Sequence, residues 1–456
     1  MDAHTYRWLD RVERRGPLYL ALADALAAAI REGELHPGDR LPPQRAVADR
    51  LGVDFTTVTR AYTVARERGL VEGTVGRGTF VRARAAEDEA GLVDLTMNLP
   101  PPPEGLSLAR LLQETTAAVL QRTDAAALMA YHPGAGTLGQ RAAGAAWLAP
   151  VLGQVAPERI LVSPGAQAGL AAVLSAVCRP GGALVAEPLS YPGVKTLAAQ
   201  LGLTLLPCPV DEAGLRPDAL DRLCAEYGPA ALYLVPAMQN PTAATLGEAR
   251  RREIARVAEA RGLWIVEDDP YSRLAEAPVP AIAALAPERT VYVGTLAKTL
   301  TPGLRTAYVA APAALLEPIG HALRALALMP APLMTAVVTS WIREGVAETL
   351  LAAVRAEARA RRALAAEALP DALGAAESPH VWLPLPEAWS PERVREAAQA
   401  RGLALVAADA FATGPEHPNG LRISLGGPGK RAVLQRALGE VARLVDGAPA
   451  AARVLV

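Results

Sequence analysis

Six short apolar runs, mostly separated by alanine-rich stretches with helical spacing, constrain the fold more than any other feature of the chain. The runs lie between residues 159 and 296 and read RILVSPG, GALVAEP, TLLPCPV, AALYLVP, LWIVEDD and TVYVGTL. Runs that are apolar at every position suit strands buried on both faces, and alternation with helices is typical of α/β proteins. We therefore expect an α/β domain in which helices cover both faces of a parallel sheet.

The last third of the chain follows a different pattern. A long alanine- and arginine-rich helix is expected at residues 345–368, and the runs HVWLPL and LRISLG are expected to be strands. This order indicates a smaller α+β subdomain attached to the main sheet. No internal repeat is visible, so we expect residues 93–450 to form one large domain.

Residues 17–82 predict a separate compact unit. Helical spacing occurs in PLYLALADALAAAIREG, PQRAVADRLG and FTTVTRAYTVARERG, and the glycine-containing run LVEGTVGRGTFV has the signature of a hairpin. Three helices followed by a hairpin form a winged helix-turn-helix. The composition changes abruptly at RARAAEDEAG, so the sequence divides into a winged helix-turn-helix unit at 1–82, a linker at 83–92 and the large domain.

The charge balance is informative only locally. The net charge is −1, which points to neither nucleic acid nor an acidic substrate, but residues 37–84 hold nine arginines against five acids. This excess suggests a surface that faces phosphates, although a solvated basic face is the alternative.

Compartment and membrane association are constrained by three observations. The cysteines are odd in number and lack the spacing of metal ligands, which favours reduced thiols and no metal site. The N-terminus has no apolar signal-peptide region, and prolines interrupt the longest apolar stretch, between Arg324 and Arg343. We expect a cytoplasmic protein that does not interact with membranes.

The start of the third helix carries short polar side chains, as a recognition helix requires where it enters the major groove. Through DRLPPQRAVADRLGV, TTVTRAY, RGLVEG and GRGTFV, nearly all of residues 17–82 resemble the GntR family of DNA-binding domains. The resemblance implies double-stranded DNA as partner, with threonines reading bases, arginines contacting phosphates and glycines letting the wing approach the backbone. The candidate DNA-binding residues are Arg40, Arg45, Thr56, Thr57, Arg60, Gly76 and Gly78.

One position departs from the family pattern. Phe55 stands where a polar or basic residue is common, and Asp54 before it is expected to cap the helix. The phenyl ring could contact a thymine methyl group or pack on the turn, and packing is favoured. A winged helix that binds protein remains the alternative for the whole unit.

Lys298 is one of only three lysines in a chain with 43 arginines. It lies in the small-residue loop VGTLAKTLTPGLR. A buried lysine can lose its proton and become nucleophilic, and a neutral amine forms a Schiff base with an aldehyde, which arginine cannot do. The loop therefore predicts an aldehyde-bearing cofactor.

Residues 93–446 resemble fold type I pyridoxal-phosphate enzymes, the aspartate aminotransferase superfamily. The resemblance rests on SPGAQ, EPLSYPG, QNPT, EDDPY, GTLAKTLTPGLR and LRISLGG, which occur in the order and at the spacing of that superfamily. It implies pyridoxal 5'-phosphate bound to Lys298.

The same resemblance implies where the cofactor phosphate lies. Gly165, Ala166 and Gln167 open a helix after a strand, where backbone N–H groups suit a phosphate dianion. Arg305 matches a guanidinium ligand of that phosphate, and Thr295 would add a hydroxyl.

Four further residues match positions around the pyridine ring. Tyr191 matches the aromatic side chain that stacks on the ring, and Asp268 matches the carboxylate that keeps the ring nitrogen protonated. Tyr271 and Asn240 match donors to the ring oxygen. Were the protein an enzyme, Lys298, Asp268 and Tyr271 would be its catalytic residues.

Two more positions imply a ligand and a second subunit. Arg422 matches the residue that binds the carboxylate of an amino-acid substrate, and Tyr131 matches a tyrosine that reaches the phosphate of a neighbouring subunit, which implies a homodimer. Three positions depart from the pattern: Ala297 stands where serine is common, Pro164 where a small hydroxyl residue is usual, and Ala243 where glycine is frequent.

A GntR-type unit joined to an aminotransferase-like domain resembles the MocR subfamily of bacterial transcription regulators. The resemblance implies a transcription factor that senses an effector, either a small amino compound or pyridoxal phosphate itself, at the Schiff base on Lys298. Two alternatives stay open: an active pyridoxal-phosphate-dependent aminotransferase with an accessory DNA-binding domain, and a catalytically silent dimerisation scaffold.

Overall fold

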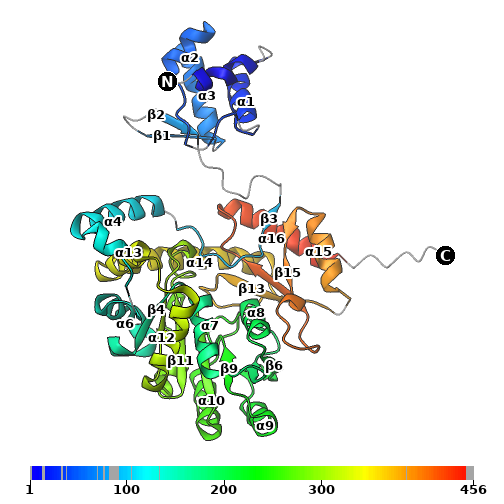
Figure 1. The fold of residues 1–456 in the computed structure, drawn as a ribbon. Coiled ribbons are helices and arrows are strands. Elements are labelled where there is room, and N and C mark those ends of the chain that lie inside the picture. Colours follow the sequence, from blue (N-terminus) through cyan, green and yellow to red (C-terminus); the bar gives the residue numbers. More distant parts are fainter. Residues whose placement is uncertain are drawn as a thin grey trace, which may run out of the picture. The chain divides into compact units, whose positions relative to one another are not determined.

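The structure is a computed structural model in which the chain divides into two compact units, Met1–Gly91 and Leu92–Val456, called here the N-terminal and C-terminal units. Figure 1 shows the elements of each unit. The described residues are 3–12, 16–31, 34–36, 38–68, 70–74, 78–81, 92–103, 105–132, 134–386 and 388–447.

The N-terminal unit contains the predicted three helices and hairpin. Its elements are η1 (Ala3–Arg11), α1 (Leu18–Arg31), α2 (Gln44–Leu51), α3 (Phe55–Glu67), β1 (Val71–Thr74) and β2 (Gly78–Val81). The two strands pair antiparallel, with Val71 opposite Val81. The short helix η1 was not predicted from the sequence; it buries Trp8 and Leu9 in the core of the unit.

The turn between α2 and α3 has the predicted capping chemistry. Gly52 adopts the left-handed conformation that ends α2, with a φ of 63°. The carboxylate of Asp54 then accepts a hydrogen bond of 2.7 Å from the backbone N–H of Thr56, in the first turn of α3. The expectation that Asp54 caps the helix is confirmed.

A seven-stranded sheet forms the centre of the C-terminal unit, and all six predicted runs are strands in it. In spatial order the strands are β4 (Ile160–Ser163), β12 (Ala307–Ala310), β11 (Thr290–Thr295), β10 (Trp264–Asp269), β9 (Ala231–Leu234), β5 (Ala183–Ala186) and β6 (Thr204–Pro207).

The expectation of a purely parallel sheet is wrong at one strand. The unpredicted strand β12 pairs antiparallel with both β11 and β4. The connection from β11 to β12 is only residues 296–306, which is too short to hold the crossover helix that a parallel return requires. The chain therefore turns back beside β11, and Lys298 lies in that turn.

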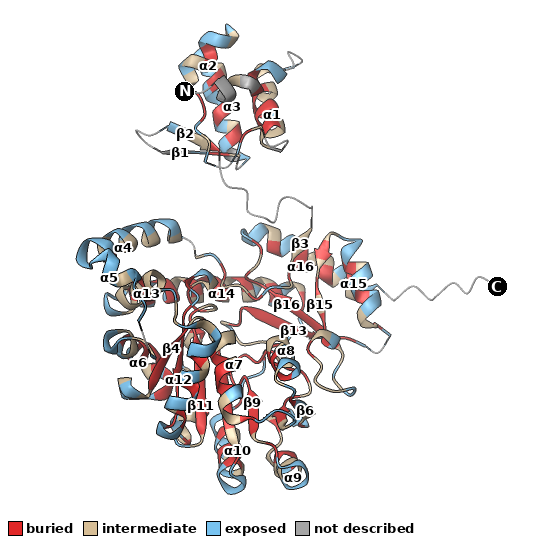
Figure 2. Cartoon of the chain, viewed as in Figure 1, coloured by how far each residue is buried: buried red, intermediate tan, exposed pale blue. Residues whose placement is uncertain are grey.

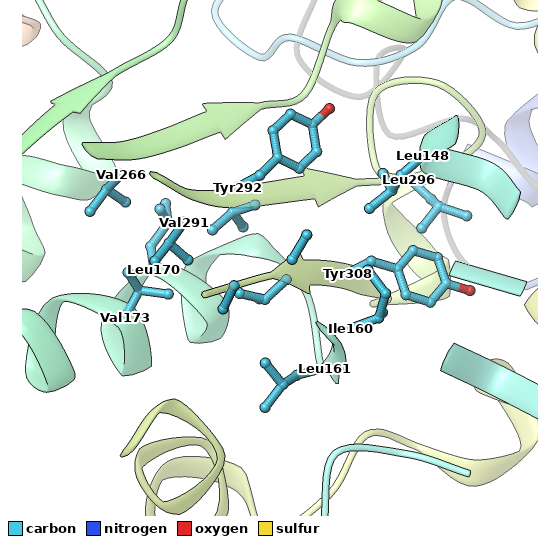
Figure 3. Close-up of a cluster of buried hydrophobic side chains, with 14 of the residues drawn as sticks. Leu148, Ile160, Leu161, Leu170, Val173, Val266, Val291, Tyr292, Leu296 and Tyr308 are labelled. Atoms are coloured by element: carbon cyan, nitrogen blue, oxygen red, sulfur yellow. The ribbon is translucent and has the colours of Figure 1, made fainter. Parts of the chain in front are cut away.

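Alternate residues of the central strands serve two different cores. On β9, Ala231 and Tyr233 face the core that contains α7 (Ala166–Val177), whereas Leu232 and Leu234 face α9 (Pro217–Tyr227) and α10 (Glu248–Arg261). Figure 2 shows the resulting buried strands between helices whose outer faces are exposed, and Figure 3 shows Leu170 and Val173 of α7 in the first core.

A smaller sheet belongs to the predicted α+β subdomain. Its strands β13 (His380–Pro384), β16 (Gly420–Ser424) and β15 (Val406–Ala407) are antiparallel. The helices α14 (Val346–Ala368), α15 (Pro391–Gln399) and α16 (Arg431–Asp446) accompany them.

The first residues of the C-terminal unit, 92–99, run along this subdomain and are called here the lead segment. Within it, β3 (Val93–Asp94) pairs in parallel with β14 (Leu403–Ala404). The backbone N–H of Ser424 donates to the carbonyl of Leu95 at 3.0 Å. Gly426 touches the segment so closely that an added Cβ atom would lie 1.8 Å from the carbonyl oxygen of Leu99.

The remaining elements surround the two sheets. They are α4 (Leu108–Arg122), α5 (Ala125–Met129), α6 (Leu138–Leu152), η3 (Pro157–Arg159), α8 (Pro192–Gln200), β7 (Val210–Asp211), β8 (Gly214–Leu215), η4 (Ser272–Leu274), α11 (Ile282–Leu285), η5 (Pro302–Leu304), α12 (Ala313–Ala327), α13 (Pro332–Arg343) and η6 (Ala408–Ala410). Over the part of the chain that the structure describes, no helix combines the length and apolar character needed to cross a membrane.

The contact at Gly426 gives a stability prediction. In Gly426→Ala, the new methyl group would overlap backbone atoms of the lead segment, and overpacking of this kind costs about 1–3 kcal/mol. The amides of Val93 and Leu95, which donate to Gly402 and Ala404, should then exchange roughly 5- to 150-fold faster with solvent deuterium.

Gly439→Ala is the matched control. Gly439 lies inside α16 with open space around its Cα atom, so alanine should stabilise that helix by about 1 kcal/mol and leave exchange in the lead segment unchanged. Equal exchange rates in the two variants would show that the lead segment does not lie against Gly426.

Candidate functional site

The two predicted base-reading threonines at the start of α3, Thr56 and Thr57, differ in their exposure and hydrogen bonds. The hydroxyl of Thr56 is exposed and donates to the carboxylate of Asp54 at 2.5 Å, so its proton belongs to the helix cap. In this arrangement the oxygen of Thr56 is available to accept a hydrogen bond, and its contact with DNA stays a prediction. Thr57 is half-buried beside it, with its backbone N–H bonded to the carbonyl of Asp54.

Phe55 does not pack on the turn, and that expectation is wrong. Its side chain is 46% exposed at the start of α3, and the guanidinium of Arg45 lies 5.9 Å from the ring centroid. Arg60, one turn further along α3, lies 4.0 Å above the ring of Tyr19. Both arginines are exposed, and each guanidinium group lies near an aromatic ring. Such a contact restricts the orientation of the side chain but leaves its positive charge available to a phosphate.

The described part of the wing places Arg40 against Gly78. Gly78 has a φ of 117°, and an added Cβ atom would lie 2.9 Å from Nε of Arg40. Arg40 also forms an isolated bridge with Phe80 of β2. Gly78 thus permits the close approach of a guanidinium from the same unit, rather than only the approach of DNA that the sequence suggested. Gly76 lies outside the described residues.

One cavity of the C-terminal unit, with a volume of about 600 Å³, gathers nearly all the other predicted residues. It opens near the carboxyl ends of β4, β10 and β11, where α/β sheets commonly bind ligands. Tyr131 is not among its lining residues and is 79% exposed. The predicted residues that line it are Gly165, Ala166, Gln167, Tyr191, Asn240, Asp268, Tyr271, Thr295, Lys298, Arg305 and Arg422.

Lys298 has the environment of a reactive amine. Burial, helped by the positive charge of Arg422 and opposed by the carboxylate of Asp268, lowers the pKa of its ammonium group to about 8. Its Nζ donates a hydrogen bond to the main-chain carbonyl of Asn98 in the lead segment. About one-tenth of this amine is therefore neutral at pH 7, far more than of an ordinary lysine.

Asp268 is a buried carboxylate near the end of β10 with one free oxygen. Oδ2 accepts a hydrogen bond of 2.7 Å from the hydroxyl of Tyr233, whereas Oδ1 has no partner among the described residues. Burial raises the pKa of this carboxyl group to about 7, against the opposing effects of Tyr233 and Lys298. A cation or a protonated nitrogen in the cavity would satisfy Oδ1 and restore the charged form.

The start of α7 forms a place for an anion. Gly165 precedes the helix with a φ of 101°, and a Cβ atom there would lie 2.8 Å from Nη2 of Arg305. Arg305 itself has a φ of 46°, unusual for a residue with a side chain. The N-terminus of α7 and the guanidinium thus meet at the same wall of the cavity, which favours a phosphate or carboxylate.

Gln167, Tyr191 and Thr295 are held in place around this wall. The hydroxyl of Tyr191 donates to Oε1 of Gln167 at 3.2 Å, and the side-chain amide of Gln167 donates to the carbonyl of Gly193 at 3.1 Å. The hydroxyl oxygen of Thr295 accepts from the backbone N–H of Ala297 at 3.2 Å.

Arg422 is buried at the subdomain side of the cavity. Nη1 donates to Oδ1 of Asn240 at 2.9 Å, and Nη2 donates to the main-chain carbonyl of Thr96. Its Nε has no partner in the described part of the chain, and its guanidinium lies 4.9 Å above the ring of Phe411. Burial lowers the pKa of this arginine, so an incoming carboxylate would be favourable.

Several cavity residues were missed by the sequence analysis. The most important are in the lead segment, where Thr96, Met97, Asn98 and Leu99 line the cavity. Asn98 was detectable only as a lone amide in an apolar run. The carbonyl groups of Thr96 and Asn98 could not be found from sequence, because every residue carries the same group.

Comparisons with known proteins agree with this division of the chain. Residues 18–81 match the family of bacterial regulatory proteins called the gntR family, and residues 90–441 match aminotransferase class I and II. The uncharacterized HTH-type transcriptional regulator YdeF of Bacillus subtilis is 31% identical over 96% of both chains. The probable rhizopine catabolism regulatory protein MocR of Rhizobium meliloti is 28% identical over 74% of both chains.

A solved structure supports the fold of the C-terminal unit. The α-aminoadipate aminotransferase LysN of Thermus thermophilus, complexed with N-(5'-phosphopyridoxyl)-L-leucine, is 26% identical with a TM-score of 0.71. The match covers 85% of this chain and 98% of that structure.

Pyridoxal phosphate is the cofactor of this domain, and the residues present fit it. The unpartnered Oδ1 of Asp268 suits a protonated ring nitrogen, the anion site at α7 suits a phosphate, and the amine of Lys298 suits an aldehyde.

The first prediction from this site concerns the pH dependence of Lys298. Because only the neutral amine is nucleophilic and its pKa is lowered to about 8, the rate at which added pyridoxal phosphate becomes covalently attached should rise with pH and reach half its maximum near pH 8. Borohydride trapping followed by peptide mass spectrometry measures the attachment.

Lysine variants provide the controls. Lys298→Ala and Lys298→Arg should both lose the trapped peptide, whereas Lys430→Ala, in an exposed position, should keep it. Trapped cofactor in Lys298→Ala would refute the assignment of the amine.

A second prediction concerns the DNA-binding surface. Arg45 is exposed beside the start of α3, so Arg45→Ala should weaken binding to all duplex sequences about equally and reduce the slope of log K against log salt by roughly one. Arg66→Ala, in the last turn of the same helix, is the control and should leave the slope unchanged. A loss confined to one DNA sequence would instead make Arg45 a base reader.

Proposed function

The chain belongs to aminotransferase class I and II and to the MocR subfamily of GntR-type transcription regulators, and we propose that it senses an effector at Lys298 and reports the effector to its DNA-binding unit. It is a DNA-binding transcription regulator with a pyridoxal-phosphate domain. The proposed effector is a small amino compound or pyridoxal phosphate itself.

A single observation carries the proposal. The main-chain carbonyl of Asn98 accepts a hydrogen bond from Lys298, and that of Thr96 accepts one from Arg422. Both carbonyls belong to the lead segment, which begins the C-terminal unit at residue 92. In the sequence, the lead segment therefore directly follows the residues that join the winged helix to the C-terminal unit.

Ligands and the lead segment compete for the same two donors. The bound cofactor supplies an aldehyde carbon that can bond to the amine of Lys298 or to that of an effector. An amine that has bonded to the aldehyde can no longer donate to Asn98 in the same way. A carboxylate bound by Arg422 would likewise replace the carbonyl of Thr96.

This competition provides the differential contacts that a conformational response requires. Cofactor bonded to Lys298 would remove the contact with Asn98, whereas an effector amine that takes over the aldehyde would free Lys298 to donate to Asn98 again. An effector carboxylate on Arg422 would remove the contact with Thr96. A ligand shifts a population only by interacting differently with two states, and here the difference is two charge-assisted hydrogen bonds.

The remaining residues of the cavity have proposed roles in holding the cofactor. Asp268 would bind the ring nitrogen, and Tyr191 would stack on the ring. The amide oxygen of Asn240 accepts a hydrogen bond from Arg422, so its NH₂ group is free to donate to the ring oxygen of the cofactor. The hydroxyl of Tyr271 would donate to the same oxygen. The phosphate would be bound by Gly165, Ala166, Gln167, Thr295 and Arg305.

We also propose the arrangement of the whole protein. Residues 1–82 would bind operator DNA, and residues 83–92 would link them to the large domain. Residues 93–450 would bind cofactor and effector and form a homodimer, in the cytoplasm. The exposed Tyr131 would reach the phosphate site of the partner subunit. Operator contacts would come from Arg40, Arg45, Thr57, Arg60, Gly76 and Gly78, and from the oxygen of Thr56.

A second function, an active aminotransferase, is favoured by the charged groups of the cavity. Lys298, Asp268 and Arg422 line one cavity with lowered or raised pKa values, as acid–base chemistry on an amino acid requires. Steady-state turnover with amino-acid and keto-acid pairs distinguishes this function from sensing alone.

Loss of the response in Arg422→Ala is the prediction that tests the sensor. An amino-acid effector should change the operator affinity of the wild-type protein by about 5- to 150-fold, the usual range of allosteric coupling. In Arg422→Ala the ratio of affinities with and without the effector should fall to about one, because the carboxylate loses its partner. Fluorescence anisotropy with labelled operator measures both affinities.

Arg256→Ala, an exposed position on α10, is the matched control and should keep the ratio. A normal response of Arg422→Ala to a carboxylate-bearing effector would contradict the proposal. A normal response to pyridoxal phosphate alone would make the cofactor the effector, and turnover of amino acids without any change in DNA affinity would support the enzyme.

A further inference from the structure

We propose that Asn98 and His380 are positioning residues that turn the hydroxyl proton of Tyr271 into the cavity, toward the ring oxygen of the bound cofactor. The inference rests on the proposed function, in which Tyr271 donates to that oxygen. Neither Asn98 nor His380 belongs to the motifs that identify the cofactor site. The three side chains form a buried chain of hydrogen bonds at one wall of the cavity.

His380 fixes the polarity of this chain. It is fully buried at the start of β13, and its Nε2 lies 3.0 Å from the main-chain carbonyl of Gln239. A carbonyl only accepts, so Nε2 must carry the proton. Burial, helped by the positive charges of Arg422 and Lys298, lowers the pKa of the imidazole to about 3, so the ring is neutral and Nδ1 carries only a lone pair.

The lone pair of Nδ1 then determines how Asn98 is oriented. The side-chain nitrogen of Asn98 lies 3.0 Å from Nδ1 of His380 and 3.1 Å from the hydroxyl oxygen of Tyr271. An amide turned the other way would place its oxygen against a lone pair. The NH₂ group must therefore occupy this position, with one hydrogen for His380 and one for Tyr271.

Tyr271 consequently accepts from Asn98 and keeps its own proton for another partner. Burial raises the pKa of its hydroxyl to about 12, so the group stays protonated. Among the described residues, the hydroxyl of Tyr271 has no acceptor for its proton, and Tyr271 lines the cavity. Were Asn98 reversed, Tyr271 would donate to its amide oxygen and present only lone pairs to the cofactor.

The test uses the absorbance of the bound cofactor in the full-length protein. A donor to the ring oxygen stabilises the form of the cofactor that has lost a proton, so losing the donor should raise the pH at which the visible absorbance titrates. Tyr271→Phe removes the donor outright and should raise the midpoint by about 1–2 pH units, the value of one hydrogen bond to a charged group.

Three variants separate positioning from simple packing. Asn98→Ala keeps the main-chain carbonyl that contacts Lys298 but removes the amide, and His380→Leu removes the acceptor that orients the amide. Both should raise the midpoint in the same direction as Tyr271→Phe. His380→Gln can still donate to Gln239 and accept from Asn98, so it should titrate as the wild type does and serves as the rescue control.

Double variants decide whether the effect passes through Tyr271. In a Tyr271→Phe background, Asn98→Ala and His380→Leu should add no further shift, since there is no hydroxyl left to orient. Additive shifts would overturn the inference, as would equal shifts in His380→Gln and His380→Leu. So would wild-type midpoints in both Asn98→Ala and His380→Leu when Tyr271→Phe is shifted.

The failure of the proposed role of Tyr271 gives a different result. If Tyr271→Phe itself titrates at the wild-type midpoint, Tyr271 is not a donor to the cofactor, and the inference falls together with that role. The effector response measured in Arg422→Ala does not depend on this outcome, so the two failures can be distinguished.

Discussion

Burial of the Lys298 side chain is the physical constraint on which the arrangement of the C-terminal unit depends. An amine becomes more nucleophilic near neutral pH when its charged form is poorly solvated, and the pKa of Lys298 is lowered mainly by burial. That burial needs a loop held between two strands of the central sheet and a lid over the amine. The antiparallel return of β12 provides the loop, and the lead segment covers it.

The other charges of the cavity follow from the same constraint. A buried carboxylate at Asp268 opposes the lowering of the lysine pKa, while a buried guanidinium at Arg422 reinforces it. Each of these groups keeps one atom without a partner in the described structure, Oδ1 of Asp268 and Nε of Arg422. A ligand that is cationic at one end and anionic at the other would satisfy both atoms, which is the charge pattern of a pyridinium ring followed by a carboxylate.

The extent to which the sequence predicted this arrangement depended on the kind of atom involved. Side chains with distinctive chemistry, such as Lys298, Asp268 and Arg422, were found because few residue types can replace them. Strand β12 was not predicted. Its antiparallel direction follows from the short connection between β11 and β12, which an apolar run does not reveal. The exposure of Phe55 was misjudged because it depends on neighbours across a turn. His380 and Asn98 meet only through the packing of segments far apart in the chain.

The contacts between the lead segment and the cavity have a consequence for how such a protein can change over generations. Lys298 and Arg422 are held by main-chain carbonyls, which every amino acid supplies. Most substitutions at Thr96 would therefore leave its contact intact, whereas insertion or deletion of one residue between Asp94 and Thr96 would move both carbonyls out of register. The length of the segment is therefore constrained together with the side chains of Leu95, which is buried, and Asn98, which contacts His380 and Tyr271.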